Sequence, residues 1–156
     1  MRRNLYRLYD ALVADARRPA LYRLSGAADC FEARFDMLVL HLVLALRQLR
    51  RDADGARASE HLIGIFLDDM DQALRESGAG DVAVGRRVRR MGEAFYGRQR
   101  AYDAALDAGD GGELADALKR NLSLSAGGAA RLAAYMDTYI DRRNLVVKET
   151  YEQKDT

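Results

Sequence analysis

The sequence predicts an all-α fold, a single-domain bundle of five to six helices around a central apolar helix at about residues 29–51. Long stretches are rich in the helix-forming residues Ala, Leu and Arg, and no segment alternates apolar and polar residues as a strand does. The chain also contains only one proline, Pro19, so few positions interrupt a helix. We expect one domain at 1–148, an ordinary size for a domain, and a frayed polar tail at 149–156.

The first helix is predicted from about Asn4 to Arg17, ending before Pro19 because the residue before a proline disfavours helical backbone. Its apolar face consists of Leu5, Leu8, Tyr9, Leu12 and Ala16. A connector then leads to Asp29, which is predicted to cap the next helix together with Glu32 three residues later.

The central helix is apolar on nearly every side between Met37 and Leu46. This run is shorter than the ~20 residues of a membrane-spanning helix, so it predicts a buried core element. His41 lies within it, with no second metal-ligating residue at a suitable spacing, and is expected to be a core histidine. Cys30, the single cysteine, excludes an internal disulfide and is expected to be a small buried hydrophobic residue.

A polar linker at 51–59 precedes the next helix, for which Ser59 is the predicted cap, and Gly78 and Gly80 are predicted to end it. Asp81 is then expected to cap a long helix.

That long helix is predicted to run to the turn at 107–112, and a short helix from Glu113 to about Leu122 follows it, capped by Asp110. The last helix has a predicted buried face formed by Leu132, Tyr135, Met136, Tyr139, Ile140, Val146 and Val147.

Three carboxylates lie almost side by side in "IFLDDMDQALRESGAG", residues 65–80. Wound at about 100° per residue, Asp68 and Asp71 fall outside the apolar arc of this helix, and Asp71 can pair with Arg75 one turn later. Asp69 falls inside the arc, so its carboxylate is predicted to enter an interior or a groove and to need a partner.

The same cluster resembles half of the aspartate-rich motif with which helical isoprenoid synthases hold Mg²⁺ against a diphosphate. Such a site needs several carboxylates aimed at one cavity, yet the helix separates Asp69 from Asp71 and no second aspartate-rich cluster occurs. We therefore favour a structural or recognition role for these residues. No nucleophile elbow or phosphate loop occurs either, so we expect no catalytic residue, no metal and no cofactor.

The long helix has two distinct faces. Its packing stripe is formed by Val88, Met91, Phe95, Tyr102 and Leu106. The opposite side carries Arg86, Arg89, Arg90, Glu93, Gly97 and Arg100, with Arg87 and Arg98 towards one flank. Every basic residue from 86 to 100 is arginine, which is favoured over lysine for bidentate or stacking contacts. This face is either simply solvated or meets an acidic or nucleic-acid surface.

Two glycines inside the long helix, Gly92 and Gly97, predict close approach of another backbone, because glycine is unfavourable in a helix interior. The turn "FYGR" at 95–98 places the Tyr96 hydroxyl beside a bare backbone and a guanidinium, which suits either recognition or helix packing.

The whole chain carries a formal net charge of +1, so no general field attracts nucleic acid or acidic lipid, and we expect no direct DNA binding. The N-terminal "MRRNLYRLYDALVADARRP" lacks the uninterrupted apolar region of a signal peptide. We therefore expect a cytoplasmic protein with no targeting extension.

Three segments in this order resemble the ubiquinol–cytochrome c chaperone family: "LYDALVADARRPALY", "FEARFDMLVLHLVLALRQL" and "FLDDMDQALRESGAGDVAVGRRVRRMGEAFYGRQRAYDAAL". The resemblance runs from about Leu5 to Leu122. It implies an all-helical, non-enzymatic assembly factor of the cytochrome bc1 complex that binds newly made cytochrome b. Peripheral contact at the inner membrane is a second option for its location, beside the cytoplasm. In mitochondrial members it also implies a small partner protein and a position near the ribosome.

From the residues and this resemblance together we expect a partner-binding surface, whose candidate residues are Phe66, Asp69, Met70, Arg86, Arg89, Arg90, Tyr96 and Arg100. Phe66, Asp69 and Met70 are expected to belong to a groove, and the others to flank a docking surface. Two alternatives remain open: a helical module that binds the ribosome, RNA or another protein, and a Mg²⁺-dependent diphosphate-binding enzyme.

Overall fold

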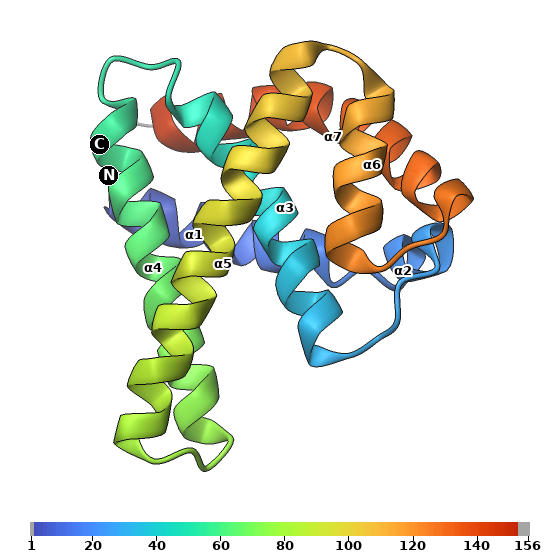
Figure 1. Ribbon diagram of the computed structural model, residues 1–156. Helices are drawn as coiled ribbons and strands as arrows, with labels where there is room; N and C mark the ends of the chain where they lie inside the picture. The colour runs from blue at the N-terminus through green and yellow to red at the C-terminus, as the bar shows by residue number, and fades with distance from the viewer. Residues whose placement is uncertain (1, 153–156) are drawn as a thin grey trace.

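The computed structural model describes the backbone of residues 2–152 and the side chains of residues 2–140. Within this part the chain is all-helical, which confirms the predicted fold class (Figure 1). Seven helices follow one another: α1 (Arg2–Ala16), α2 (Pro19–Ser25), α3 (Phe31–Leu49), α4 (Gly55–Glu76), α5 (Asp81–Ala108), α6 (Gly111–Leu122) and α7 (Ala126–Glu152). None of these helices is both long and apolar enough to cross a membrane.

The predicted number of helices was too low because α2 occupies the connector that follows α1. Pro19 begins α2, which proline permits because its fixed φ suits the first helical turn and that turn uses no backbone donor. Gly26 ends it with φ of 72°, in the left-handed conformation that glycine adopts without strain.

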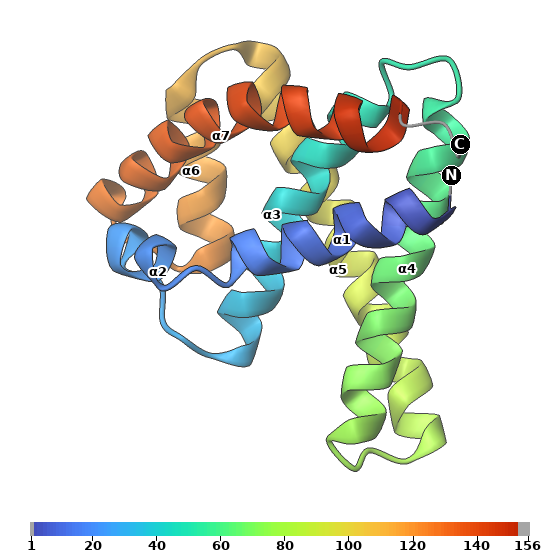
Figure 2. The ribbon, with the colours of Figure 1, turned by 180° about the vertical axis from the view of Figure 1, so that it is seen from behind.

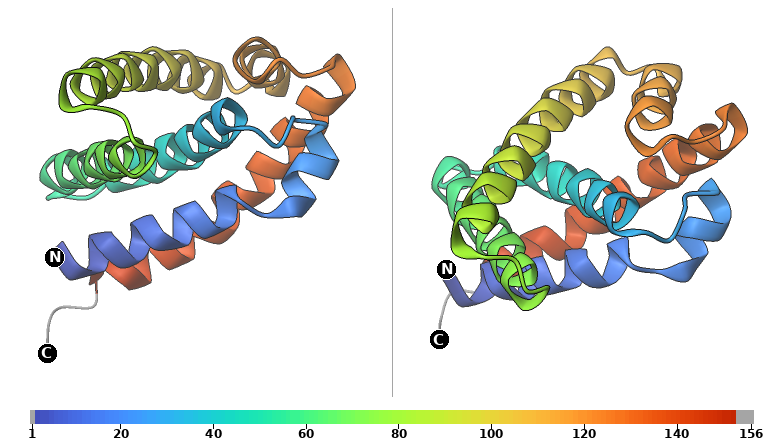
Figure 3. Two further views of the ribbon diagram at one scale, coloured as in Figure 1. Left: turned by 90° about the horizontal axis from the view of Figure 1, so that it is seen from below. Right: turned by 60° about the horizontal axis from the view of Figure 1, so that its bottom comes forward.

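The helices form three layers (Figure 3). The middle layer holds α3 and α4, with α5 and α6 on one side and α1, α2 and α7 on the other. All side chains from Met37 to Leu46 are buried, so α3 is the central helix that the sequence predicts. The predicted apolar face of α1 is also buried in full.

The C-terminal half of α4 and the N-terminal half of α5 project beyond the rest of the molecule as an antiparallel arm (Figures 1 and 2). Gly78, with φ of 87°, lies in the turn at its tip. Gly80, not Asp81 as predicted, is the N-cap of α5, and the Asp81 carboxylate pairs with Arg75 across the turn. The arm faces the start of α3, and the candidate site lies between them.

Two further predicted caps are wrong, and each residue has another role. Asp29 does not cap α3; its carboxylate forms an ion pair with Arg34 at 2.7 Å, and Cys30 takes the cap position. Ser59 is buried inside α4, whose N-cap position is Asp54, five residues earlier than predicted. Asp110 does cap α6, accepting a hydrogen bond from the Gly112 backbone N–H at 2.8 Å.

The two glycines predicted to meet another backbone do not do so. A Cβ at Gly92 would make only an ordinary contact with Leu67, and a Cβ at Gly97 would meet open space. Close backbone approach occurs elsewhere. A Cβ at Gly55 would lie 1.8 Å from the Leu49 carbonyl oxygen, and one at Gly128 would lie 2.0 Å from the Ser25 carbonyl oxygen.

Cys30 is exposed, contrary to prediction. His41 is fully buried as predicted: its Nδ1 lies 2.7 Å from the Met37 carbonyl oxygen, and its ring meets Tyr139 edge-on.

The predicted buried face of the last helix is confirmed for Leu132, Met136 and Tyr139, while Tyr135 and Ile140 are partly buried. Val146 and Val147 lie outside the described side chains. Of the predicted tail, residues 149–152 continue α7, and residues 153–156 lie outside the described part of the chain.

Candidate partner-binding grooves

Two aromatic side chains at the start of α3 form a ridge on the surface. Phe31, the first residue of the helix, is 54% exposed, and Phe35 one turn later is half-buried. Below Phe35 lies the Phe66 ring, with its centroid 6.0 Å away, and the Phe95 ring follows at 5.5 Å from Phe66. These tilted ring contacts support Phe35 from below. A groove lies on either side of it.

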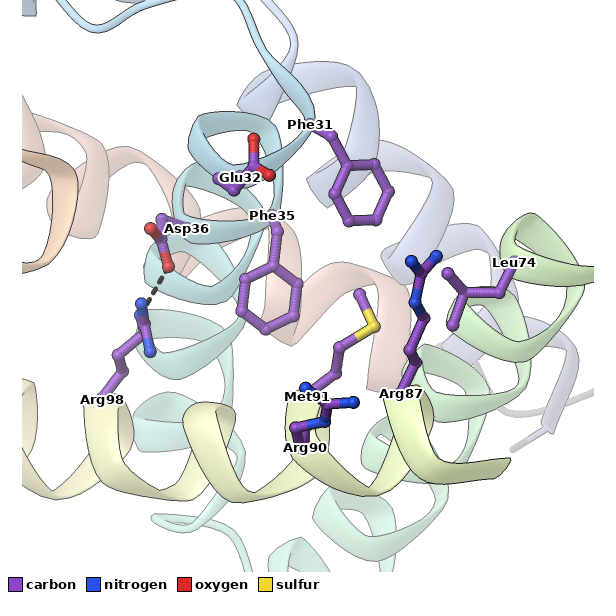
Figure 4. A pocket seen from close by; sticks show the side chains of 9 residues that line it. All are labelled: Phe31, Glu32, Phe35, Asp36, Leu74, Arg87, Arg90, Met91 and Arg98. Carbon is purple, nitrogen blue, oxygen red and sulfur yellow. Dashed lines mark ion pairs between the residues drawn. The ribbon is translucent and has the colours of Figure 1, made fainter. Parts of the chain in front are cut away.

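The α5-side groove has a volume of about 380 Å³ and lies between the start of α3 and the arm (Figure 4). It is lined by Phe31, Glu32, Phe35, Asp36, Leu74, Arg87, Arg90, Met91 and Arg98. Apolar side chains from α3, α4 and α5 therefore converge on one hollow, with the exposed guanidinium groups of Arg87 and Arg90 at its edge.

An ion pair joins α3 to α5 in this groove. Arg98 Nε lies 2.5 Å from Asp36 Oδ1, and the Arg98 guanidinium also lies 5.8 Å from the centre of the Phe35 ring. Asp36 is buried, and its burial raises the carboxyl pKa above the usual value, although the positive charge of Arg98 opposes this shift. The pairing thus offsets only part of the cost of desolvating the carboxylate.

The α1-side groove has a volume of about 330 Å³. It is lined by Val13, Ala16, Arg17, Phe31, Arg34, Phe35, Leu38, Asp69, Met70, Ala73, Glu76 and Ser77. The Phe31–Phe35 ridge is thus a wall that the two grooves share.

Asp69 is half-buried and lines the α1-side groove, one of the two positions predicted for it, and its partner is a phenol. The Tyr9 hydroxyl donates a hydrogen bond of 2.7 Å to Asp69 Oδ2. Tyr9 is buried in α1, and its burial and the neighbouring carboxylate both raise the pKa of the phenol. The hydrogen bond therefore holds one oxygen of Asp69 within the groove wall and connects α1 to α4.

The sequence-predicted site residues divide into three groups. Asp69 and Met70 line the α1-side groove and Arg90 lines the α5-side groove. Phe66 is fully buried, so it supports the ridge from below and contributes no surface to a groove. The remaining four are exposed on α5 and line neither groove: Arg86, Arg89, Tyr96 and Arg100.

Sequence reasoning missed the ridge and the Asp36–Arg98 pair. One signal was present, because Phe31 and Phe35 are spaced one turn apart outside the fully apolar run of α3. Asp36, the acid next to that run, was a second signal, since a carboxylate at the edge of a buried segment needs a cation from another element. Which cation this is depends on how α5 packs against α3.

The three aspartates of α4 point in different directions and have different partners. Asp71 pairs with Arg75 as predicted, with Arg75 Nε 2.6 Å from Asp71 Oδ2, and Asp68 is exposed. Asp69 points to Tyr9. Among the described side chains, no group of three or more His, Cys, Asp or Glu residues is placed to hold a metal ion.

The fold and the paired grooves define an all-α protein whose candidate site is a recognition surface between helices. A family model described as "Ubiquinol-cytochrome C chaperone" matches residues 23–155, most of the chain, and the protein belongs to that family. The match begins and ends later than the resemblance at Leu5 to Leu122 indicates. It covers every residue that lines the α5-side groove.

A solved structure has the same fold. The crystal structure of the Cbp3 homolog from Brucella abortus is 33% identical in sequence, with a TM-score of 0.74 over 97% of this chain and 82% of that chain. Among curated protein sequences, no match was found.

Proposed function

We propose that this protein is a non-enzymatic assembly chaperone of the cytochrome bc1 complex that binds newly made cytochrome b at the Phe31–Phe35 ridge. Membership of the ubiquinol–cytochrome c chaperone family supports the client class. The observation that supports the place of binding is the exposed Phe31 ring, which stands between two grooves.

An unassembled membrane protein exposes apolar segments that aggregate unless another apolar surface covers them. The two grooves offer such surface on both sides of one aromatic ridge. The α5-side groove is the more basic of the two, with Arg87, Arg90 and Arg98 against Glu32 and Asp36, whereas Arg17 and Arg34 balance Asp69 and Glu76 in the α1-side groove. This difference in charge can orient a bound segment.

A photo-crosslinking amino acid in place of Phe31 tests this proposal in cells. Benzoylphenylalanine preserves the aromatic ring, so the substitution retains the ridge. Tyr6 on α1 is the matched control position, because it is 53% exposed against 54% for Phe31 and lines neither groove.

We expect cytochrome b among the products crosslinked from position 31 and its absence from products at position 6. Equal yields from both positions would refute the assignment of the ridge. Ribosomal proteins or a small soluble partner at position 31, without cytochrome b, would instead support the alternative of a ribosome- or protein-binding module.

A further inference from the structure

One line of side chains along α5 belongs to neither groove. It consists of Val82, Arg86, Arg89, Glu93, Tyr96 and Arg100, which we call the outer stripe. The spacing alternates between four and three residues, so these side chains form a nearly straight row on one face of the helix. The row spans roughly 27 Å, at 1.5 Å per residue.

Every residue of the outer stripe is exposed. Val82 is 75% exposed and Tyr96 is 45% exposed, and they are two of the few large hydrophobic side chains at the described surface. Figure 3 shows why: α5 packs against the middle layer on one side and leaves its other side uncovered along the arm. Val82 is therefore largely free of packing, whereas the Tyr96 ring meets the Phe95 ring edge-on, with centroids 5.1 Å apart, and leaves the rest of its surface uncovered.

The charge of the protein is concentrated at the same place. Six arginines and one glutamate lie between residues 82 and 101, a formal charge of +5, so the rest of the chain carries −4 of the total of +1. Within the stripe, Arg89 pairs with Glu93 at 3.4 Å, but both side chains are mostly exposed and such a pair is weak. Arg86 and Arg100 are exposed at opposite ends of the arginine run.

Guanidinium groups bind phosphate oxygens in bidentate geometry, and a straight row of them fits a flat array of phosphates. Lipid headgroups form such an array, and just beneath them lies an apolar layer that receives Val82 and the Tyr96 ring. We propose that the outer stripe binds the surface of a bilayer that contains anionic phospholipids, with α5 parallel to the membrane plane. The proposal does not depend on the identity of the client.

Co-sedimentation of the purified protein with protein-free vesicles tests it. We expect binding to phosphatidylcholine vesicles that contain phosphatidylglycerol and little binding to phosphatidylcholine alone. Each basic residue near an anionic surface strengthens binding by roughly fivefold, so Arg86→Gln with Arg100→Gln should weaken it by about 25-fold. Neither arginine lines a groove.

The matched control is Arg7→Gln with Arg57→Gln, which removes the same charge from exposed positions on α1 and α4. This variant should bind the vesicles as the wild type does. An equal loss in both double variants would show that overall charge, not the stripe, drives binding and would overturn the proposal.

Val82→Ser separates a bilayer from a nucleic acid. It should weaken binding to anionic vesicles several-fold, because it removes the apolar contact and leaves every charge in place. Binding to a single-stranded RNA oligonucleotide serves as the comparison. Unchanged vesicle binding by Val82→Ser, or RNA binding tighter than vesicle binding, would overturn the bilayer assignment.

Discussion

Arg98 on α5 and Asp36 on α3 form an ion pair of 2.5 Å beside the Phe35 ring, in the α5-side groove. The pKa of the Asp36 carboxyl is nevertheless raised, because the carboxylate is buried and the arginine compensates only in part. The two partners therefore contribute unequally to stability.

We expect Asp36→Asn to leave the free energy of unfolding at pH 7 unchanged or slightly higher, since the neutral amide avoids the cost of a buried charge. Arg98→Met should lower it by about 3 kcal/mol, because the buried carboxylate then loses its counterion. Urea unfolding of both variants measures the asymmetry. A large loss in Asp36→Asn would show that the pair stabilises the fold outright.

The same residue predicts a pH dependence. A raised pKa means that the folded state binds the Asp36 proton more tightly than the unfolded state does, so stability falls as pH rises from 3.8 through the raised pKa. In Asp36→Asn the amide does not titrate, so this contribution to the pH dependence is absent. The two proteins should therefore be equally stable below pH 3.8. Above that pH the free energy of unfolding of Asp36→Asn should exceed that of the wild type, as measured by urea titrations repeated across this range.

Tyr9→Phe should destabilise the protein by about 1–2 kcal/mol at neutral pH, because it removes the hydrogen bond to Asp69. Tyr6→Phe, at an exposed position of the same helix, is the control and should have no effect. The folded-state pKa of Tyr9 is raised above 10, so the stability that its neutral phenol confers is complete below pH 10 and is lost above it. The difference between Tyr9→Phe and the wild type should narrow in alkaline solution.

Glycine substitutions test the close backbone contacts. Gly55→Ala should lower the free energy of unfolding by about 3 kcal/mol, because its Cβ would overlap the Leu49 carbonyl oxygen. Gly64→Ala, in the same helix but with no atom in the way, should raise it by about 0.5–1 kcal/mol. Thermal unfolding followed by circular dichroism distinguishes these opposite signs.

Charge reversal at two neighbouring arginines separates the two proposed surfaces. Arg90 lines the α5-side groove, whereas Arg89 belongs to the outer stripe. Arg90→Glu should reduce the yield of cytochrome b crosslinked from position 31 several-fold. Arg89→Glu should retain that yield and weaken vesicle binding instead. Similar effects of both substitutions on the crosslink would assign Arg89 to the client surface as well.

Local patterns predicted much of the fold. The buried face of α1 and the whole of α3 follow from apolar periodicity, which depends on neighbouring residues alone. The caps at Asp29, Ser59 and Asp81 failed because a polar side chain near a helix start can be used in several ways. Two of the three instead pair with an arginine that the fold brings near.

The candidate site was less predictable, because it is made between elements. The sequence places Asp69 in an apolar arc, but its partner Tyr9 is 60 residues away and only the packing of α1 against α4 joins them. The pattern of its own helix predicts Phe66 to lie in a groove, but Phe35 of α3 and Phe95 of α5 cover it. The exposure of Phe31 depends on the residue at which α3 begins, and the predicted cap at Asp29 placed that start one residue too early.

Because the Phe31–Phe35 ridge is a wall of both grooves, a segment bound in one groove contacts side chains that also line the other. A segment that turned the Phe31 ring to widen the α5-side groove would narrow the space beside Asp69. Occupancy of the two sides would then be thermodynamically linked, and the linkage would be reciprocal: each ligand would change the affinity for the other by the same factor.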